Sequence, residues 1–224
     1  MGQQEALTEA VEEYLEAIHG LTAAGETSSV TGLAARLGVR PASVTGMLKR
    51  LASLGLVTHQ RYGRIGLTRE GERRAHEVIR RHRLAERMLT DLLHMPLDQV
   101  HDEACRLEHA VSPELEARIA RRLGDPELCP HGHPIEADAA AETMALTEAP
   151  HRQPLTVVRL GDEQAEVVRY LARRGLLPGA RVTVTDREPL EGTLVVEVKG
   201  ETHTLGPRLA AGVRVVREAE KGEG

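Results

Sequence analysis

Apolar residues recur at three- and four-residue spacing through the first half of the chain, a pattern that predicts amphipathic helices. Leu7, Val11, Leu15 and Ile18, for example, share one face of a helix. Proline and glycine separate the periodic segments, and Gly55 follows one of them as a glycine after a helix commonly does. The helices expected from this pattern span residues 5–22, 30–37, 42–54, 68–93, 96–111 and 114–123.

Alternation of apolar and polar residues, which is typical of strands, appears in two places. The first is a pair of short segments, 56–60 and 65–68, which predicts a hairpin with the basic tip 61–64. The second begins at Pro154, after a stretch of low hydrophobicity that is expected to be a linker. Short strands separated by Gly and Pro, with one helix among them, favour a small barrel. Its expected elements are strands 155–159, 180–184, 193–198, 203–205 and 212–216 and helix 163–174.

A helix, a tight turn, a second helix and a hairpin together predict a winged helix-turn-helix in the N-terminal part of the chain. Ser43 and Thr45 near the start of the second helix suit base edges, and Lys49 and Arg50 suit phosphates. The alternative is an ordinary three-helix domain with a solvated hairpin. The candidate DNA-contacting residues are Arg40, Ala42, Ser43, Thr45, Gly46, Lys49, Arg50, Arg61, Tyr62 and Arg64.

Side chains able to bind a transition metal share faces of two successive helices. On a helix, residues three, four, seven or eight apart lie on one side. Any one of these residues alone is more often solvated, or in the case of a cysteine packed as a small apolar group. Six of them in register instead favour a divalent metal site. They are His82 and Glu86 on the first helix and His101, Cys105, Glu108 and His109 on the second.

Two further groups of possible ligands are less specific. Glu13 and Glu16 are three residues apart on the first helix. Exposure to solvent is the default for such side chains, and the alternative is that both face a partner helix. Cys129, His131 and His133 lie in an irregular segment and would form a zinc clip only with a fourth ligand that the sequence does not supply. A plain loop is the favoured interpretation of that segment.

Composition and charge limit the classes of function that the chain is expected to have. The net charge is −5, yet residues 36–87 contain thirteen Lys and Arg against four Asp and Glu, so one basic block in an acidic chain is expected to meet a polyanion. No secretory signal and no apolar run long enough for a membrane helix are visible. Two cysteines are too few for a disulfide framework and favour the cytoplasm.

The order of these motifs resembles the diphtheria toxin repressor and manganese transport regulator family along nearly the whole chain. The motifs that carry the resemblance are the winged helix, His-Arg-Leu-Ala-Glu at 82–86, His-Asp-Glu-Ala-Cys-Arg-Leu-Glu-His at 101–109 and the terminal barrel. The resemblance implies a mainly α fold with a small β part and a homodimer that binds operator DNA of pseudo-palindromic sequence. The implied domains are a winged helix-turn-helix (1–75), a helical metal-binding and dimerisation domain (76–143), a linker (144–153), an SH3-like, FeoA-like barrel (154–217) and a tail (218–224).

The resemblance also implies about two ions per subunit, Mn(II) or Fe(II), with Zn(II), Co(II) or Ni(II) as substitutes. One ion would be held by His82, Glu86 and His101, and the other by Cys105, Glu108, His109 and an N-terminal carboxylate, Glu13, with Glu16 added as in manganese-type members. This chain pairs the Cys of iron-type members with the carboxylate of manganese-type members. A ligand from the barrel has no clean match; Asp162 is the nearest candidate.

The sequence therefore predicts a metal-activated transcriptional repressor in metal-ion homeostasis, with no small-molecule substrate and no membrane partner. In this hypothesis the metal anchors the first helix and so sets the spacing of the two recognition helices. Two rival hypotheses remain: a constitutive winged-helix regulator whose metal is only structural, and a non-haem metalloenzyme. Against an enzyme, no nucleophile elbow or phosphate-binding loop is apparent in the sequence.

Overall fold

The computed structural model describes residues 7–59, 64–136, 142–161 and 164–218. The chain divides into two compact units: the first comprises Met1–His82 and Glu108–Val111, and the second comprises Arg83–Leu107 and Ser112–Gly224. Helix α4 (Arg69–Asp91) therefore contributes residues to both. Among the described residues, no helix combines the length and the apolar character that crossing a membrane requires.

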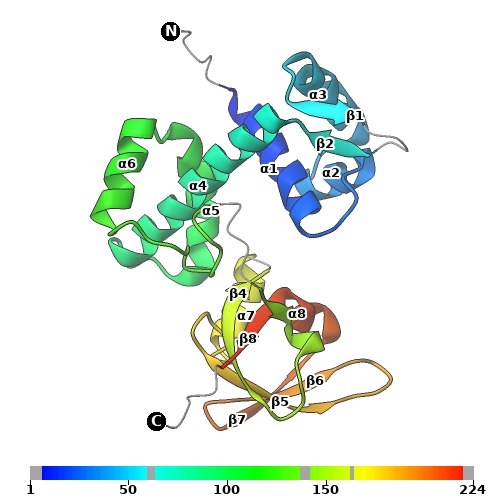
Figure 1. Cartoon of the computed structure of the whole chain (residues 1–224), viewed down its shortest axis with the longest axis vertical. Coiled ribbons are helices and arrows are strands. Elements are labelled where there is room, and N and C mark those ends of the chain that lie inside the picture. The colour runs from blue at the N-terminus through cyan, green and yellow to red at the C-terminus, as the bar shows by residue number, and fades with distance from the viewer. Residues whose placement is uncertain (1–6, 60–63, 137–141, 162–163, 219–224) are drawn as a thin grey trace. The chain divides into compact units, whose positions relative to one another are not determined.

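The first unit is a winged helix-turn-helix (Figure 1). It contains α1 (Glu9–Ala23), α2 (Val30–Leu37), α3 (Pro41–Ser53) and an antiparallel hairpin of β1 (Val57–His59) and β2 (Ile65–Leu67). The start of α4 and the short 3-10 helix η2 (Glu108–Ala110) complete it. The two elements predicted to form a helix-turn-helix and the predicted hairpin are thus confirmed.

Local chemistry fixes the ends of these helices. The Ser29 hydroxyl accepts a hydrogen bond from the Gly32 N–H at 3.1 Å and so caps α2, and Gly38 ends α2 in the left-handed conformation. Gly71 allows α4 to lie against the hairpin, because a Cβ there would come within 2.0 Å of the Leu56 carbonyl oxygen. Fully buried apolar side chains then join α1, α2 and α3 in one core. They include Leu15, Ile18, Leu33, Val44 and Leu51.

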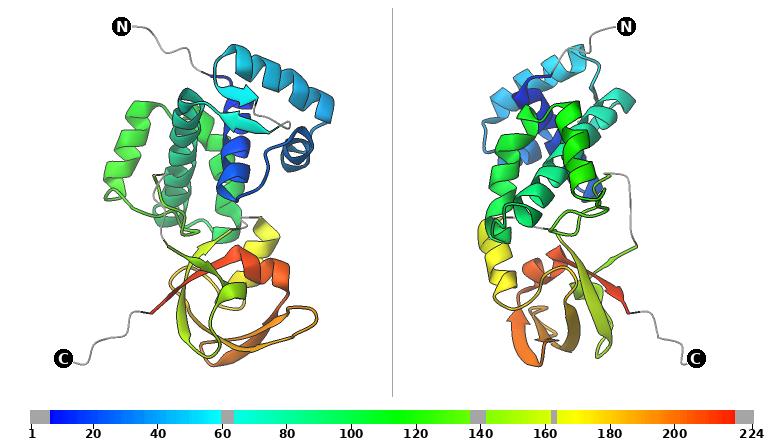
Figure 2. Two further views of the ribbon diagram at one scale, coloured as in Figure 1. Left: turned by 45° about the vertical axis from the view of Figure 1, so that its right-hand side comes forward. Right: turned by 90° about the vertical axis from the view of Figure 1, so that its left-hand side faces the viewer.

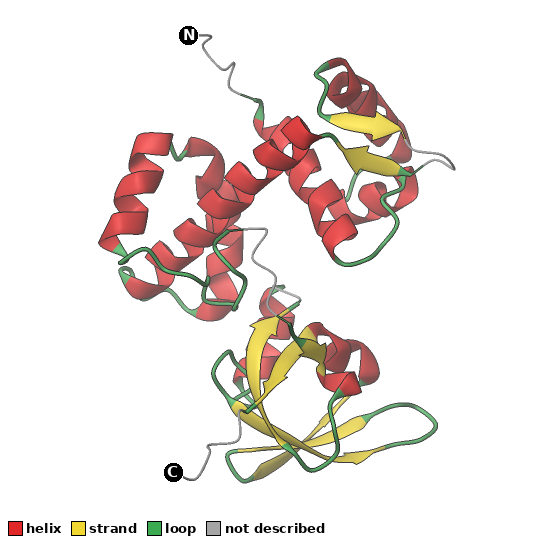
Figure 3. Ribbon diagram, in the orientation of Figure 1, coloured by secondary structure: helices red, strands yellow, loops and turns green. Residues whose placement is uncertain are grey.

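The second unit combines helices with a six-stranded sheet, whose strands appear in yellow in Figure 3. Its helical part holds the end of α4, α5 (Leu97–Leu107), α6 (Pro113–Arg122) and a loop. The sheet has the order β3-β8-β4-β5-β6-β7 and is antiparallel throughout its named pairs. Two further views show these strands curving around a common interior (Figure 2). The strands are β3 (Met144–Ala145), β4 (Pro154–Leu160), β5 (Arg181–Arg187), β6 (Leu194–Val198), β7 (Glu201–Leu205) and β8 (Val213–Arg217).

Alternating burial along the strands builds the core of this barrel. Along β4, for example, Leu155, Val157 and Leu160 are fully buried, and a register shift between Val157 and Arg159 keeps the last of them inside. Helices α7 (Ala165–Ala172) and α8 (Pro207–Gly212) add Leu171 and Ala210 to the same core. A core made of Val, Leu and Ala suits a chain that contains no Phe and no Trp.

Three expectations differ from the structure. The segment 144–153, expected as a linker, contains β3 and the 3-10 helix η3 (Leu146–Glu148), and Leu146 is fully buried in the barrel core. The helix expected over 96–111 is α-helical only to Leu107 and continues as η2, because its last turn tightens. Helix α8 was not expected, since its six residues are too few to display a clear helical period.

Candidate metal centre

In the first unit, carboxylates and imidazoles from three elements converge. Glu16 on α1, His82 on α4 and Glu108 on η2 offer ligand atoms that all lie within 4.8 Å of one another. His82 is 4% exposed and Glu108 is 2% exposed. One oxygen of Glu108, Oε2, lies 2.5 Å from His82 Nδ1, while Oε1 lies 3.3 Å from His109 Nε2. Glu108 therefore joins two imidazoles through its two oxygens.

A second acidic group on α1 surrounds His109. Ligand atoms of Glu9, Glu13 and His109 also lie within 4.8 Å of one another, in a more exposed setting. Glu13 acts on its neighbour as well: the pKa of Tyr14 is raised above its ordinary value of 10.0, first by burial and then by the negative charge of Glu13. The α1 carboxylates thus face the same η2 turn that carries Glu108.

In the second unit, a carboxylate, a thiol and an imidazole meet in a fully buried place. Ligand atoms of Glu86 on α4 and of Cys129 and His131 in the loop after α6 lie within 4.8 Å of one another. Glu86 and His131 are 0% exposed and Cys129 is 3% exposed. His131 Nδ1 is 3.0 Å from Glu86 Oε1, and His131 Nε2 is 3.3 Å from the Leu97 carbonyl oxygen. Because a carbonyl oxygen only accepts, Nε2 of His131 is the donor in its contact with Leu97.

The barrel holds this loop in place. The Leu160 N–H of β4 donates to the His131 carbonyl at 2.9 Å, and the His133 ring donates from Nε2 to the Leu160 carbonyl at 2.8 Å. Between them, Gly132 adopts φ +88° and lies so close to β4 that a Cβ would be 1.9 Å from the Val158 carbonyl oxygen. Only glycine fits this position, so backbone contacts to β4 place Cys129 and His131.

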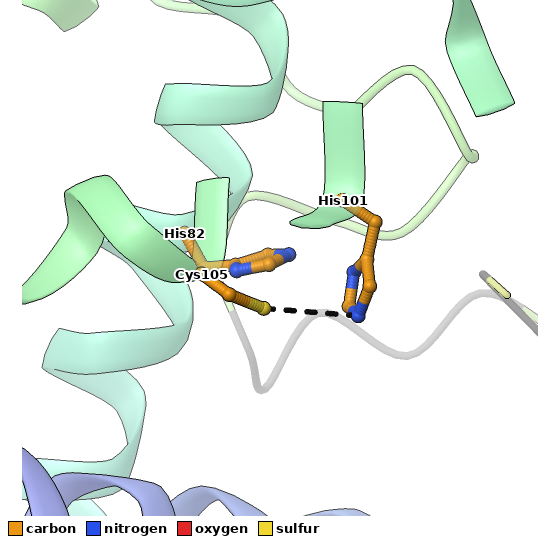
Figure 4. Close-up of side chains that lie close together, drawn as sticks. All are labelled: His82, His101 and Cys105. Atoms are coloured by element: carbon orange, nitrogen blue, oxygen red, sulfur yellow. Dashed lines mark hydrogen bonds between the residues drawn. The ribbon is translucent and has the colours of Figure 1, made fainter. Parts of the chain in front are cut away.

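His101 and Cys105 lie on α5 beside this second group. His101 Nε2 is 3.8 Å from Cys105 Sγ, an interaction drawn in Figure 4, and His101 Nδ1 is 3.7 Å from Glu86 Oε1. Their i, i+4 spacing on one helix face is the one expected from the sequence. Cys105 is partly exposed.

The expected ligands are divided between the two units of the chain, and the two predicted ligand sets stay predictions. Of the first expected set, Glu86 and His101 belong to the second unit and His82 to the first. Of the second set, Glu108 and His109 belong to the first unit with Glu13 and Glu16, whereas Cys105 belongs to the second. Asp162 lies outside the described residues.

Cys129 and His131, considered in the sequence as part of a zinc clip but given a plain loop as the favoured interpretation, lie buried beside Glu86 in the structure. The available signal was the sequence Cys-Pro-His-Gly-His at 129–133, in which two donors flank a turn. The donor chemistry of both groups fits a divalent ion: carboxylate and imidazole in the first unit, with a thiol added in the second.

The expected DNA-reading face of α3 is open to solvent. Val44, Leu48 and Leu51 are buried in the core, which turns the opposite side of the helix outward. Exposure is what base and phosphate contacts require, while the contacts themselves stay a prediction. Arg61 and Tyr62 lie outside the described residues. The exposed candidates are Arg40, Ala42, Ser43, Thr45, Gly46, Lys49, Arg50 and Arg64.

Family models match the chain in three consecutive segments. Residues 6–65 match the model of an iron dependent repressor N-terminal DNA binding domain, residues 68–137 match an iron dependent repressor metal binding and dimerisation domain, and residues 144–217 match a FeoA domain.

Whole-chain relatives agree with these matches. The chain is 33% identical over 225 residues to the iron-dependent repressor IdeR of Mycobacterium leprae (strain TN), with 93% of this chain and 97% of that protein covered. It is 30% identical over 223 residues to the diphtheria toxin repressor of Corynebacterium diphtheriae, with the same shares covered. Both relatives are named as repressors, in agreement with the prediction of a regulator and not of an enzyme.

Solved structures are similar along the same length. A manganese-dependent transcriptional repressor in complex with manganese has a TM-score of 0.84 and 36% identity, with 93% of this chain and 100% of that chain covered. The protein ScaR with bound Zn²⁺ has a TM-score of 0.83 and 26% identity, with 93% and 99% covered. The fold with a DNA-binding domain, a helical domain and an SH3-like barrel is thereby confirmed.

Proposed function

We propose, since this chain belongs to the family of iron-dependent transcriptional repressors, that it represses genes of metal-ion homeostasis when Mn(II) or Fe(II) occupies two centres in each subunit. It acts as a cytoplasmic homodimer on a pseudo-palindromic operator. Zn(II), Co(II) and Ni(II) are substitutes for the same donors. The observation that carries this proposal is the fully buried group of Glu86, Cys129 and His131.

A buried carboxylate beside two metal-capable side chains is best explained by a ligand role. Burying a carboxylate is expensive unless a cation or hydrogen bonds compensate for the lost water. A bound divalent ion supplies that positive charge. In the second centre, Glu86, Cys129 and His131 hold the ion, with His101 at their side. A thiolate among these ligands favours Fe(II) over Mn(II) at this centre.

The first centre relates metal binding to the position of the helix that contacts DNA. Glu16, His82 and Glu108 hold the second ion, and Glu13 and His109 extend the same group. Glu16 belongs to α1, whose apolar face packs in one core with α3. Ligands on α1, α4 and η2 therefore tie the winged helix to the helix that leads into the rest of the chain. In a dimer, this constraint favours the arrangement in which two α3 helices meet successive major grooves about 34 Å apart.

The deciding experiment measures operator affinity as a function of metal. A duplex selected from a random-sequence pool in the presence of Mn(II) is labelled, and its fluorescence anisotropy is followed under anaerobic conditions at fixed salt. Mn(II) and Fe(II) are titrated separately. We expect at least one of them to raise operator affinity tenfold or more, and Glu86→Gln and Glu108→Gln to reduce that gain.

Glu103→Gln serves as the matched control, because Glu103 is an exposed carboxylate on α5 that pairs with Arg106. It should leave the metal response unchanged. If neither metal changes operator affinity while a chelator lowers only thermal stability, the regulator is constitutive and its metal is structural.

A further inference from the structure

Glu12 lies between two cationic or proton-bearing groups from other elements of the first unit. Its Oε2 is 2.7 Å from His109 Nδ1 on η2, and its Oε1 accepts a hydrogen bond from Arg81 Nη2 on α4 at 2.7 Å. Glu12 and His109 side chains are each 12% exposed and that of Arg81 is 15% exposed, so water screens these contacts only partly. One carboxylate on α1 thus connects α1 to both α4 and η2.

The contact to Glu12 decides which nitrogen of His109 carries a hydrogen. An ionised carboxylate only accepts hydrogen bonds, so Nδ1 of His109 is the donor in this pair. In the neutral ring the other nitrogen, Nε2, then presents its lone pair, and it lies 3.3 Å from Oε1 of Glu108. A divalent cation is able to accept this lone pair and the facing carboxylate oxygen together.

Arg81 fixes the orientation of the Glu12 carboxylate toward His109. Its guanidinium donates to the oxygen that does not meet His109, which leaves Oε2 for the imidazole. Charge-assisted hydrogen bonds of this kind are shorter and stronger than neutral ones. The carboxylate is therefore fixed in place from one side while it orients His109 on the other.

We propose that Glu12 is the positioning residue of the first metal centre: it holds the His109 ring with Nδ1–H toward α1 so that Nε2, beside Glu108, is the atom offered to a divalent cation. This inference rests on the proposed function, since it presupposes that the first centre binds metal. Ligand histidines commonly donate their second ring nitrogen to a carboxylate, and loss of such a partner weakens metal binding about 10–100-fold. Glu12 itself is not a ligand in this arrangement.

The test compares Glu12→Gln with Glu77→Gln in the full-length chain. A glutamine at position 12 is able both to accept from and to donate to the ring, so it no longer selects one tautomer. Glu77 is a matched control, because it is a carboxylate of α4 paired with Arg73 and Arg74 in the same unit. Mn(II) affinity is measured from the electron paramagnetic resonance of the free ion. The His109 tautomer is read from long-range 1H–15N spectra of 15N-histidine-labelled protein loaded with Zn(II), with His109→Gln for assignment.

We expect Glu12→Gln to weaken one of the two bound ions about 10–100-fold, to leave the other unchanged, and to give a mixture of His109 tautomers. Glu77→Gln should change neither. Three results overturn the inference: equal Mn(II) affinity in wild type and Glu12→Gln, equal losses in both variants, or Zn(II) bound at Nδ1 of wild-type His109. If the wild-type chain binds no Mn(II) in this centre, the proposed function fails instead.

Discussion

Gly132→Ala is the substitution that most directly tests whether the barrel places the ligands of the second metal centre. A Cβ at this position would lie 1.9 Å from the Val158 carbonyl oxygen and 2.8 Å from its carbon. Both atoms belong to the backbone of β4, which has no free end to move, so the loop must move away. The hydrogen bonds of Leu160 with His131 and His133 break as it does so.

The size of the effect follows from these contacts. A non-glycine residue in the left-handed region costs about 1–2 kcal/mol, and each lost hydrogen bond costs about 0.5–1.5 kcal/mol. The expected destabilisation of the loop is therefore about 2–5 kcal/mol. Because Cys129 and His131 move with the loop, metal affinity at the second centre should fall about 10–100-fold, as it does when supports of a ligand are lost.

Gly179→Ala is the matched control for this experiment. Gly179 has the same φ of +88°, in the same unit, but no atom lies within 4 Å of the place of its Cβ. It should show the conformational cost alone, about 1–2 kcal/mol, and bind metal as the wild type does. Calorimetric titration with Fe(II) or Zn(II) and thermal unfolding with and without metal measure both quantities. If Gly132→Ala binds metal like Gly179→Ala, the contact with β4 does not position the ligands.

The remaining predictions concern the winged helix and the start of α4. Gly46→Ala should raise the free energy of unfolding by about 0.5–1 kcal/mol, because no atom lies within 4 Å of its Cβ position inside α3; an unchanged melting temperature would contradict this. Lys49→Ala should flatten the slope of log operator affinity against log salt by about one unit without changing metal affinity, and an unaltered slope would exclude a phosphate contact. The carboxyl pKa of Glu70 is lowered from 4.5 to about 2, first by the hydrogen bond from Arg73. The stabilisation from this pair is fully present above pH 4.5 and is lost as the pH falls through about 2, so Arg73→Gln should bring the pKa, measured by carboxyl 13C NMR, back toward 4.5.

Local periodicity of apolar residues is sufficient to predict most of the secondary structure. The helix predicted for 30–37 has those bounds, and the predicted hairpin pairs Val57 with Leu67. The segment around Leu146 was different, because one buried leucine among alanines and prolines has no period. Its place in the barrel depends on β3 pairing with β8, about seventy residues later in the chain.

The ligand types were also readable from the sequence, because helical spacing places His101 four residues before Cys105 on one face and His82 four residues before Glu86. Helical spacing did not give the partners of each ligand on other helices, and only the family resemblance joined Glu108 and His109 to Glu13 and Glu16. Glu108 and His109 were expected on an α-helical stripe, but the 3-10 turn of η2 redirects them toward Glu16 and Glu12 on α1. Spacing in the sequence describes neighbours within one helix, whereas contacts between helices depend on packing.

The contact of Cys129 and His131 with Glu86 could not be predicted from the sequence by itself. Cys129 lies forty-three positions after Glu86, and nothing local relates a loop thiol to a helix carboxylate. The tertiary structure decides this contact, since Gly132 lets the loop lie against β4 and the barrel thereby turns both donors toward α4. The chain sequence specified the donors, and long-range packing of the loop between a strand and a helix brought them together.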